Sequence, residues 1–143
     1  MLPSRFNVYV SPSGRNDIQD TIDGYDDYAR ESFSREVANL SVTPKDQWQA
    51  PHAKKLTNED PLYEIIYMAN RCQTRAIGYF EKAGGTFTIV AICTHKGKVY
   101  DPPNIFKSAH KRIKKLEQGC ATTVSLKING ENFPPNGEQQ YRT

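Results

Sequence analysis

The sequence predicts an α+β protein, and three observations lead to this class. Apolar residues recur at helical spacing between residues 17 and 40. Three runs rich in β-branched and aromatic residues follow, with short turns between them. A second helical pattern comes after the last run, over residues 105–116. Because a sheet needs cover on a face, we expect two N-terminal helices and a C-terminal helix packed on a mainly antiparallel sheet of four to five strands.

The N-terminal part of the chain is expected to contain one short strand before its helices. Residues 6–10 alternate apolar and polar side chains, and Pro12 and Gly14 mark a turn after them. The helical pattern that follows is interrupted by Gly24. The sequence therefore predicts either two helices or one helix broken near this glycine.

The three β-rich runs form the expected centre of the sheet. They cover residues 62–68, 74–80 and 86–94, and turn residues separate them. Short connections of this kind favour an antiparallel meander. The third run is the most apolar and β-branched, so we expect it to be a buried central strand.

A basic loop and a helix are expected directly after this central strand. The loop, residues 95–98, contains one histidine and two lysines. Asp101 and Pro102 are typical of an N-cap and a first helical position, so the helix is expected to begin there. Its apolar stripe runs from Ile105 to Leu116, and Gly119 is expected to end it.

The C-terminal part is expected to add one strand and a tail. Residues 122–128 alternate and predict an edge strand. Residues 129–143 are polar and contain a Pro-Pro pair, which favours a flexible tail. We therefore expect a single domain over residues 1–128, followed by this tail.

Composition narrows the class of protein and the kind of partner. With 143 residues and 37% hydrophobic residues, the chain has no apolar run of membrane-spanning length. Its three cysteines match neither a disulfide framework nor a zinc site, so we expect reduced thiols and a cytoplasmic protein. Residues 1–70 hold seven Lys/Arg against eleven Asp/Glu, whereas residues 71–143 hold twelve against five. A basic second half favours a polyanionic partner.

Five segments, taken in order, resemble one family. They are a Gly-Arg turn leading into the helices over residues 14–40, a proline-to-leucine element at 51–56, a Leu-Tyr-Glu strand at 62–66, an arginine-led strand at 75–80, and a His-Lys loop with proline and a helix at 95–112. The order of these segments resembles the RelE/HigB-like toxin superfamily, most closely its phage-derived branch.

This resemblance implies a RelE-like fold and a toxin of a type II toxin–antitoxin system that acts in stress response. Such toxins are endoribonucleases that cleave mRNA, often on the ribosome, without a metal or cofactor. The implied partners are mRNA and a cognate antitoxin protein, and no membrane. Two departures remove cations from the region that engages RNA: Ile66 replaces an arginine and Gly97 replaces a lysine. A catalytically inactive phage or mobile-element protein, binding nucleic acid or protein, is therefore the alternative. A small structural protein that docks an acidic partner is a third possibility.

Four residues are the candidate catalytic set implied by this chemistry. Arg75 is expected to bind the phosphate, because guanidinium matches phosphate oxygens in a planar fork. Imidazole titrates near neutral pH, so His95 is a candidate acid or base, and a hydrogen-bonded histidine in a turn is its alternative. Lys96 and Lys98 are expected to supply positive potential for the transition state, and solvated surface lysines are the alternative. The alternative for Arg75 is a salt bridge on the sheet, with Glu64 as the partner.

Further residues are candidates for RNA binding. Tyr100 is expected to stack on a base, as aromatic rings do with unpaired RNA, although packing under the helix is its alternative. Basic side chains are expected to support binding from the turns and the helix: Arg71, Lys107, Lys111 and Arg112. No metal ligands are expected.

Overall fold

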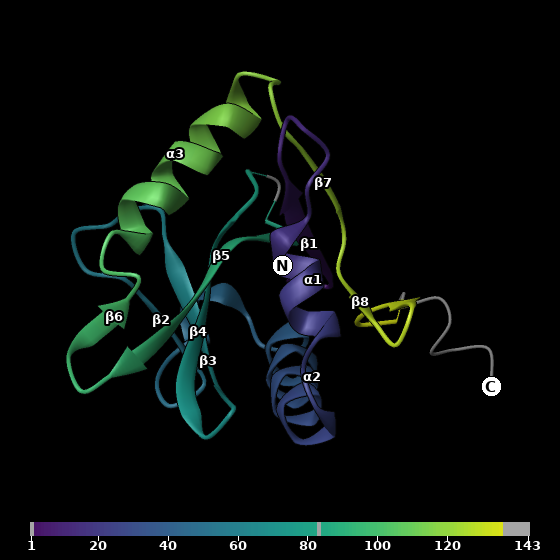
Figure 1. Cartoon of the computed structure of the whole chain (residues 1–143), viewed down its shortest axis with the longest axis vertical. Helices are drawn as coiled ribbons and strands as arrows, with labels where there is room; N and C mark the ends of the chain where they lie inside the picture. Colours follow the sequence, from purple (N-terminus) through teal and green to yellow (C-terminus); the bar gives the residue numbers. More distant parts are fainter. Residues whose placement is uncertain (1, 83, 136–143) are drawn as a thin grey trace.

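A seven-stranded mixed sheet is the centre of the structure within the described residues, 2–82 and 84–135 of the computed structural model. Its strand order is β2-β3-β4-β5-β1-β7, and β6 pairs with β5 outside this path (Figure 1). In chain order the elements are β1 (Arg5–Val10), α1 (Asp17–Asp23), α2 (Asp27–Ser41), the 3-10 turn η1 (Lys45–Gln47), β2 (Ala53–Lys55), β3 (Tyr63–Ala69), β4 (Cys72–Phe80), β5 (Thr86–Lys96), β6 (Val99–Asp101), α3 (Ile105–Glu117), β7 (Thr122–Ser125), β8 (Lys127–Ile128) and β9 (Glu131–Asn132).

The antiparallel meander predicted from the three β-rich runs is confirmed by the pairing of β3 with β4 and of β4 with β5. The predicted RelE-like sheet of four to five mainly antiparallel strands is wrong. β1 lies between β5 and β7, and it runs parallel to β5, which makes the sheet mixed. Periodicity along one strand says nothing about its neighbour, and β2 and β6 are too short to show any alternation.

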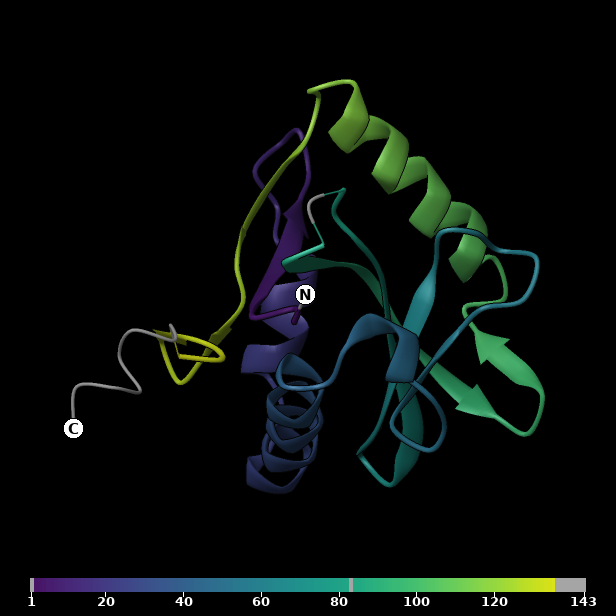
Figure 2. The same cartoon turned by 180° about the vertical axis from the view of Figure 1, so that it is seen from behind.

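The two N-terminal helices are present as predicted, but the three helices cover both faces of the sheet and not one face. The N-terminal region forms two helices, with Gly24 ending α1 and Asp26 capping α2. Figures 1 and 2 show α1 and α2 on one side of the sheet and α3 on the other. α3 is not the last element, because the chain continues into β7, which returns to the edge of the sheet beside β1. Within the described residues, no helix has both the length and the apolar character needed to cross a membrane.

The predicted start of α3 at Asp101 and Pro102 is wrong. Asp101 belongs to β6 and pairs with Thr94 on β5. The helix begins at Ile105, after Asn104, and the Ile105 amide donates a hydrogen bond to the Pro102 carbonyl at 3.2 Å. An Asp-Pro-Pro segment suits a turn between a strand and a helix as well as it suits a helix start. Gly119 follows the helix with a φ of +75°, in the left-handed region expected of a stop.

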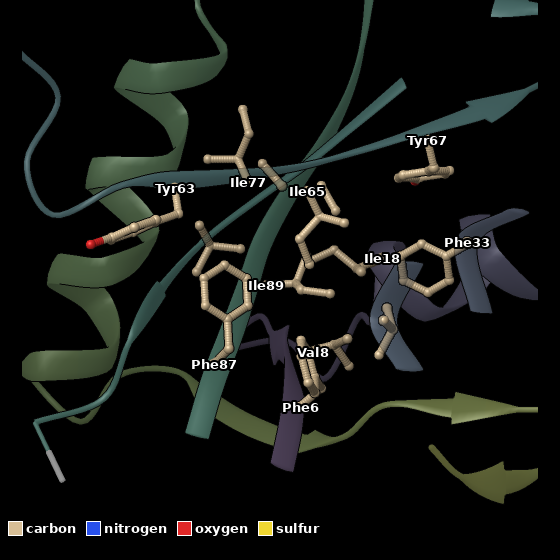
Figure 3. Packing of buried hydrophobic residues seen from close by; sticks show 14 of the residues in the cluster. Phe6, Val8, Ile18, Phe33, Tyr63, Ile65, Tyr67, Ile77, Phe87 and Ile89 are labelled. Carbon is tan, nitrogen blue, oxygen red and sulfur yellow. The ribbon is translucent and has the colours of Figure 1, made fainter. Parts of the chain in front are cut away.

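The main hydrophobic core lies between α1, α2 and the sheet. Phe6, Phe33, Ile65 and Phe87 are among its fully buried side chains (Figure 3). Trp48, just after η1, lies 4.9 Å from Phe87 between ring centroids, so this connecting segment also closes the core. Each such side chain contributes about 1.5–3 kcal/mol by leaving water.

The C-terminal segments differ in part from the prediction. The edge strand expected over residues 122–128 is divided into β7, which pairs with β1, and β8, which pairs with β9. Residues 131–132, expected in the tail, therefore form a strand. The rest of the expected tail, residues 136–143, lies outside the described residues.

Candidate functional site

Four side chains from four consecutive strands meet on the face of the sheet that carries α3. Glu64 is on β3, Arg75 on β4, His95 on β5 and Tyr100 on β6. Alternate residues of a strand share a face, so the pairing of Arg75 with Cys93 also places His95, two residues further on, on the same face. His95 is paired directly with Tyr100 across the hairpin. The register of the strands therefore assembles this cluster.

Glu64 and Arg75 form a buried ion pair at the base of the cluster. The Arg75 Nε–H donates to Glu64 Oε2 at 2.9 Å, and the two residues are 6% and 0% exposed respectively. The second carboxylate oxygen of Glu64 accepts a hydrogen bond from the Tyr100 hydroxyl at 2.6 Å. A buried carboxylate needs this kind of compensation, because its water shell has been removed.

The other nitrogen atoms of Arg75 are directed to three further acceptors. Nη1 donates to the Thr74 carbonyl at 3.2 Å, and Nη2 donates to Gln73 Oε1 at 3.0 Å. Nη2 also lies 3.0 Å from His95 Nδ1. Four of the five N–H groups of the guanidinium are thus used inside the protein. The salt bridge considered for Arg75 is present, and phosphate binding by Arg75 stays a prediction.

His95 and Tyr100 form a stacked pair at the open side of the cluster. Their ring centroids lie 4.3 Å apart, and Tyr100 meets Phe106 of α3 edge-to-face at 4.7 Å. Burial, followed by the nearby Arg75 charge, lowers the pKa of His95 from 6.5. Burial and the hydrogen bond to Glu64 raise the pKa of Tyr100, so its phenol stays protonated and acts as a donor.

The predicted lysines Lys96 and Lys98 lie at the tip of the β5–β6 hairpin, next to this cluster in the chain. Both side chains are exposed, and neither forms an ion pair within residues 2–82 and 84–135. Gly97 between them has a φ of +62°, a backbone region that disfavours other residues. This turn gives a local physical reason for a glycine where the resembling family has a lysine.

The remaining candidate RNA-binding residues are dispersed. Arg71 is exposed in the β3–β4 turn, and Lys107 and Lys111 are exposed on α3. Arg112 is held by Asp17 of α1 at 2.8 Å, and its guanidinium lies 4.7 Å above the Tyr9 ring. Arg112 thus links α3 to α1 and β1 through these two contacts. Binding of RNA by Arg112 stays a prediction.

Comparisons of the chain with protein-family models, with curated proteins and with solved structures find no match.

The residues around the cluster offer neither a metal site nor a reactive cysteine within the described part of the chain. Among residues 2–82 and 84–135, no group of three or more His, Cys, Asp or Glu side chains is placed to hold a metal ion. Cys93 lies opposite Arg75 in the sheet, and burial raises the pKa of its thiol to about 12. A thiol with so high a pKa stays protonated at neutral pH and is a poor nucleophile.

Two residues that bind Arg75, one inside the cluster and one beside it, were missed as functional residues from the sequence. Glu64 was assigned only as a structural partner, and Gln73 was not considered. A carboxylate inside the apolar segment from Tyr63 to Tyr67 is a signal, because a charge in a buried strand requires a partner. Gln73 has no comparable signal, since its role depends on the rotation of the Arg75 guanidinium.

Proposed function

We propose that this protein is an RNA-directed toxin of a type II toxin–antitoxin system, acting as a metal-independent endoribonuclease on mRNA in the cytoplasm. One observation carries the proposal: Arg75, His95 and Tyr100, each selected from the sequence, meet in one hydrogen-bonded network beside the Lys96–Lys98 hairpin tip. The motif order that resembles RelE/HigB-like toxins, with their antitoxin partners and phage-derived members, supports the same function.

The proposed reaction is attack of the ribose 2′-oxygen on the adjacent phosphate. The 2′-hydroxyl proton passes to water, negative charge develops on the phosphate oxygens, and the 5′-oxygen leaves and takes a proton from water. Lys96 and Lys98 are free to lie beside these oxygens and to lower the pKa of the 2′-hydroxyl. His95 is the polar ring nearest to them in the hairpin, and the Tyr100 ring beside it offers a surface for a base.

The binding-module alternative is favoured by a specific contact. Arg75 is buried and paired with Glu64, so it would have to rearrange before it could bind a phosphate. Ile66, at the position where the resembling toxins carry an arginine, is the direct cross-strand neighbour of Arg75 and adds no cation. A protein that binds RNA without cleaving it fits these two facts.

RNA binding is expected to weaken as salt rises, because bound lysines release counterions from the phosphates. Replacing both Lys96 and Lys98 with alanine is expected to lower the slope of log K against log salt by about 1.4 for single-stranded RNA. Filter binding over a salt series measures this slope. The control is Arg35→Ala, which removes an exposed charge on α2 and is expected to leave the slope unchanged. Equal slopes for all three proteins would contradict an RNA site at the hairpin.

Cleavage distinguishes the toxin from the binding module. Induced expression in a bacterial host is expected to stop growth and to cut transcripts, which primer extension detects. The purified protein is expected to cut free RNA in the presence of a metal chelator, and mRNA on programmed ribosomes in a buffer that contains the magnesium they require. Intact transcripts in both settings, together with salt-dependent binding, would replace the enzyme with the binding module.

A further inference from the structure

We infer that the buried Glu64–Arg75 pair holds His95 in a single neutral form, with its proton on Nε2, so that His95 serves as a hydrogen-bond donor and not as a general base. The role of this donor in RNA cleavage rests on the proposed function. The form of the ring itself does not, since it follows from contacts within the protein.

The first step of the argument is the chemistry of the contact between Arg75 and His95. A guanidinium carries only donors and keeps its proton in proteins. An Nη2–Nδ1 distance of 3.0 Å is therefore a hydrogen bond only when Nδ1 offers its lone pair. A protonated ring would set two donors and two positive charges against each other. The neutral ring must then carry its hydrogen on Nε2.

The second step is that Arg75 has little freedom to turn away. Its Nε, Nη1 and Nη2 atoms are fixed by Glu64, the Thr74 carbonyl and Gln73 respectively. Glu64 is in turn held by the Tyr100 hydroxyl and is fully buried. The contact with Nδ1 is thus an end of a rigid network and not a chance approach of two mobile side chains.

The third step concerns the charges that act on His95 from each neighbouring strand. Arg75 on β4 and Lys54 on β2 disfavour the imidazolium, as burial does, whereas Glu64 on β3 favours it. Gln73 on β4 and Tyr100 on β6 are neutral. The balance lowers the pKa of His95 below 6.5, so the ring is neutral at pH 7.

The consequence for catalysis is specific. Nδ1 is occupied by Arg75, and Nε2 already carries a proton, so neither nitrogen is free to take the 2′-hydroxyl proton. Within the described residues, Nε2 makes no hydrogen bond. Its N–H is available to a phosphate oxygen, with the positive charge supplied by the exposed lysines of the hairpin. Arg75 and Glu64 then act through His95 as positioning residues.

The protein contains its own reference for the measurement. His52 Nδ1 lies 2.9 Å from a Glu36 carboxylate oxygen, which can only accept a hydrogen bond. The Nδ1 atoms of His52 and His95 thus face opposite partners, a carboxylate and a guanidinium. His110, the third histidine, has its Nε2 3.0 Å from the Glu59 carboxylate.

The test is long-range proton–nitrogen NMR on the ¹⁵N-labelled full chain, recorded from about pH 8 down to about pH 5, on either side of the usual histidine pKa. Deletion of each signal by a His→Gln variant assigns the three rings. We expect an unprotonated Nδ1 and a protonated Nε2 for His95, and a protonated Nδ1 for His52. In Arg75→Leu, the His95 pKa is expected to rise and its Nδ1 signal to move towards that of a ring exchanging between both forms.

A protonated Nδ1 in neutral His95, or a folded Arg75→Leu protein with an unchanged His95 spectrum, would overturn the inference. If Arg75→Leu does not fold, Glu64→Gln gives the second measurement. Loss of that negative charge is expected to lower the His95 pKa further while Arg75 stays in place, and a rise would count against the network. No RNA is needed for this measurement. The expected spectrum in a protein that does not cleave RNA would therefore support the fixed neutral form of the His95 ring and reject only the proposed function.

Discussion

Replacing Arg75 with alanine is expected to lower the free energy of unfolding by about 3–5 kcal/mol, because it leaves a buried charge without its partner. Glu64 is 0% exposed, and its only cationic partner within the described residues is Arg75. A loss of this size is a large share of the roughly 5–15 kcal/mol that stabilises a typical domain. Urea denaturation followed by circular dichroism measures it directly.

Two variants make this result interpretable. Arg35→Ala removes an exposed arginine on α2 and is expected to change the free energy of unfolding by less than about 0.5 kcal/mol. The double variant Glu64→Leu with Arg75→Leu removes both charges and is expected to be more stable than Arg75→Ala. An Arg75→Ala protein as stable as the parent would show that the Glu64 carboxylate is not buried as an ion.

Because Arg75 is paired with Glu64, changes at Arg75 affect both the activity and the stability of the protein. A loss of cleavage in Arg75→Ala combines lost chemistry with lost stability, so it does not by itself assign a phosphate contact. Arg75→Lys keeps the charge near Glu64 but lacks the second arm that reaches His95. Activity in Arg75→Lys, measured at a temperature where the protein is folded, separates the two effects.

The sequence predicted the parts of the fold that depend on local pattern. The meander of β3, β4 and β5 follows from long β-rich runs with short turns, and the break at Gly24 follows from the interrupted helical spacing. The parallel pairing of β1 with β5 depends on contacts between residues about eighty positions apart. No local pattern encodes it. The strand at Val99–Asp101 was missed because three residues are too few to show a period.

Three of the four side chains of the cluster were selected from the sequence, but the contacts among these three were not predicted. Arg75, His95 and Tyr100 were each selected for their chemistry, and the strand register then brings them together. What the sequence left open was the direction of the guanidinium. Its Nε is turned to Glu64 and its Nη2 to His95, and such orientations are decided by packing and hydrogen bonding in three dimensions. This difference moves Arg75 from the expected phosphate contact towards support of His95.

If the protein cleaves RNA as proposed, the largest effect on the cleavage rate is expected from replacing His95. Replacing it with alanine is expected to slow cleavage a hundredfold or more, which corresponds to about 3 kcal/mol, as for loss of one donor to a developing oxyanion. Single-turnover cleavage of a short RNA, measured with enzyme in excess, gives the rate of the chemical step. Arg35→Ala, with its exposed side chain on α2, is the matched control and is expected to cleave at the parent rate.

Glutamine at the same position separates the two chemical roles of His95. Its amide N–H₂ can lie near the place of the imidazole Nε2–H, so His95→Gln is expected to keep much more activity than His95→Ala if the ring only donates a hydrogen bond. A ring that transfers a proton has no substitute in glutamine, and both variants would then be equally slow.

The pH dependence of the cleavage rate is an independent test of the role of His95. If His95 only donates a hydrogen bond from its neutral ring, the cleavage rate of the parent protein stays constant as the pH rises above the His95 pKa, which lies below 6.5. If His95 is a general acid, the rate falls as the pH rises through this pKa, because the imidazolium is lost. Equal defects in both variants, together with such a fall, would return His95 to proton transfer and require Arg75 to release Nδ1 during the reaction.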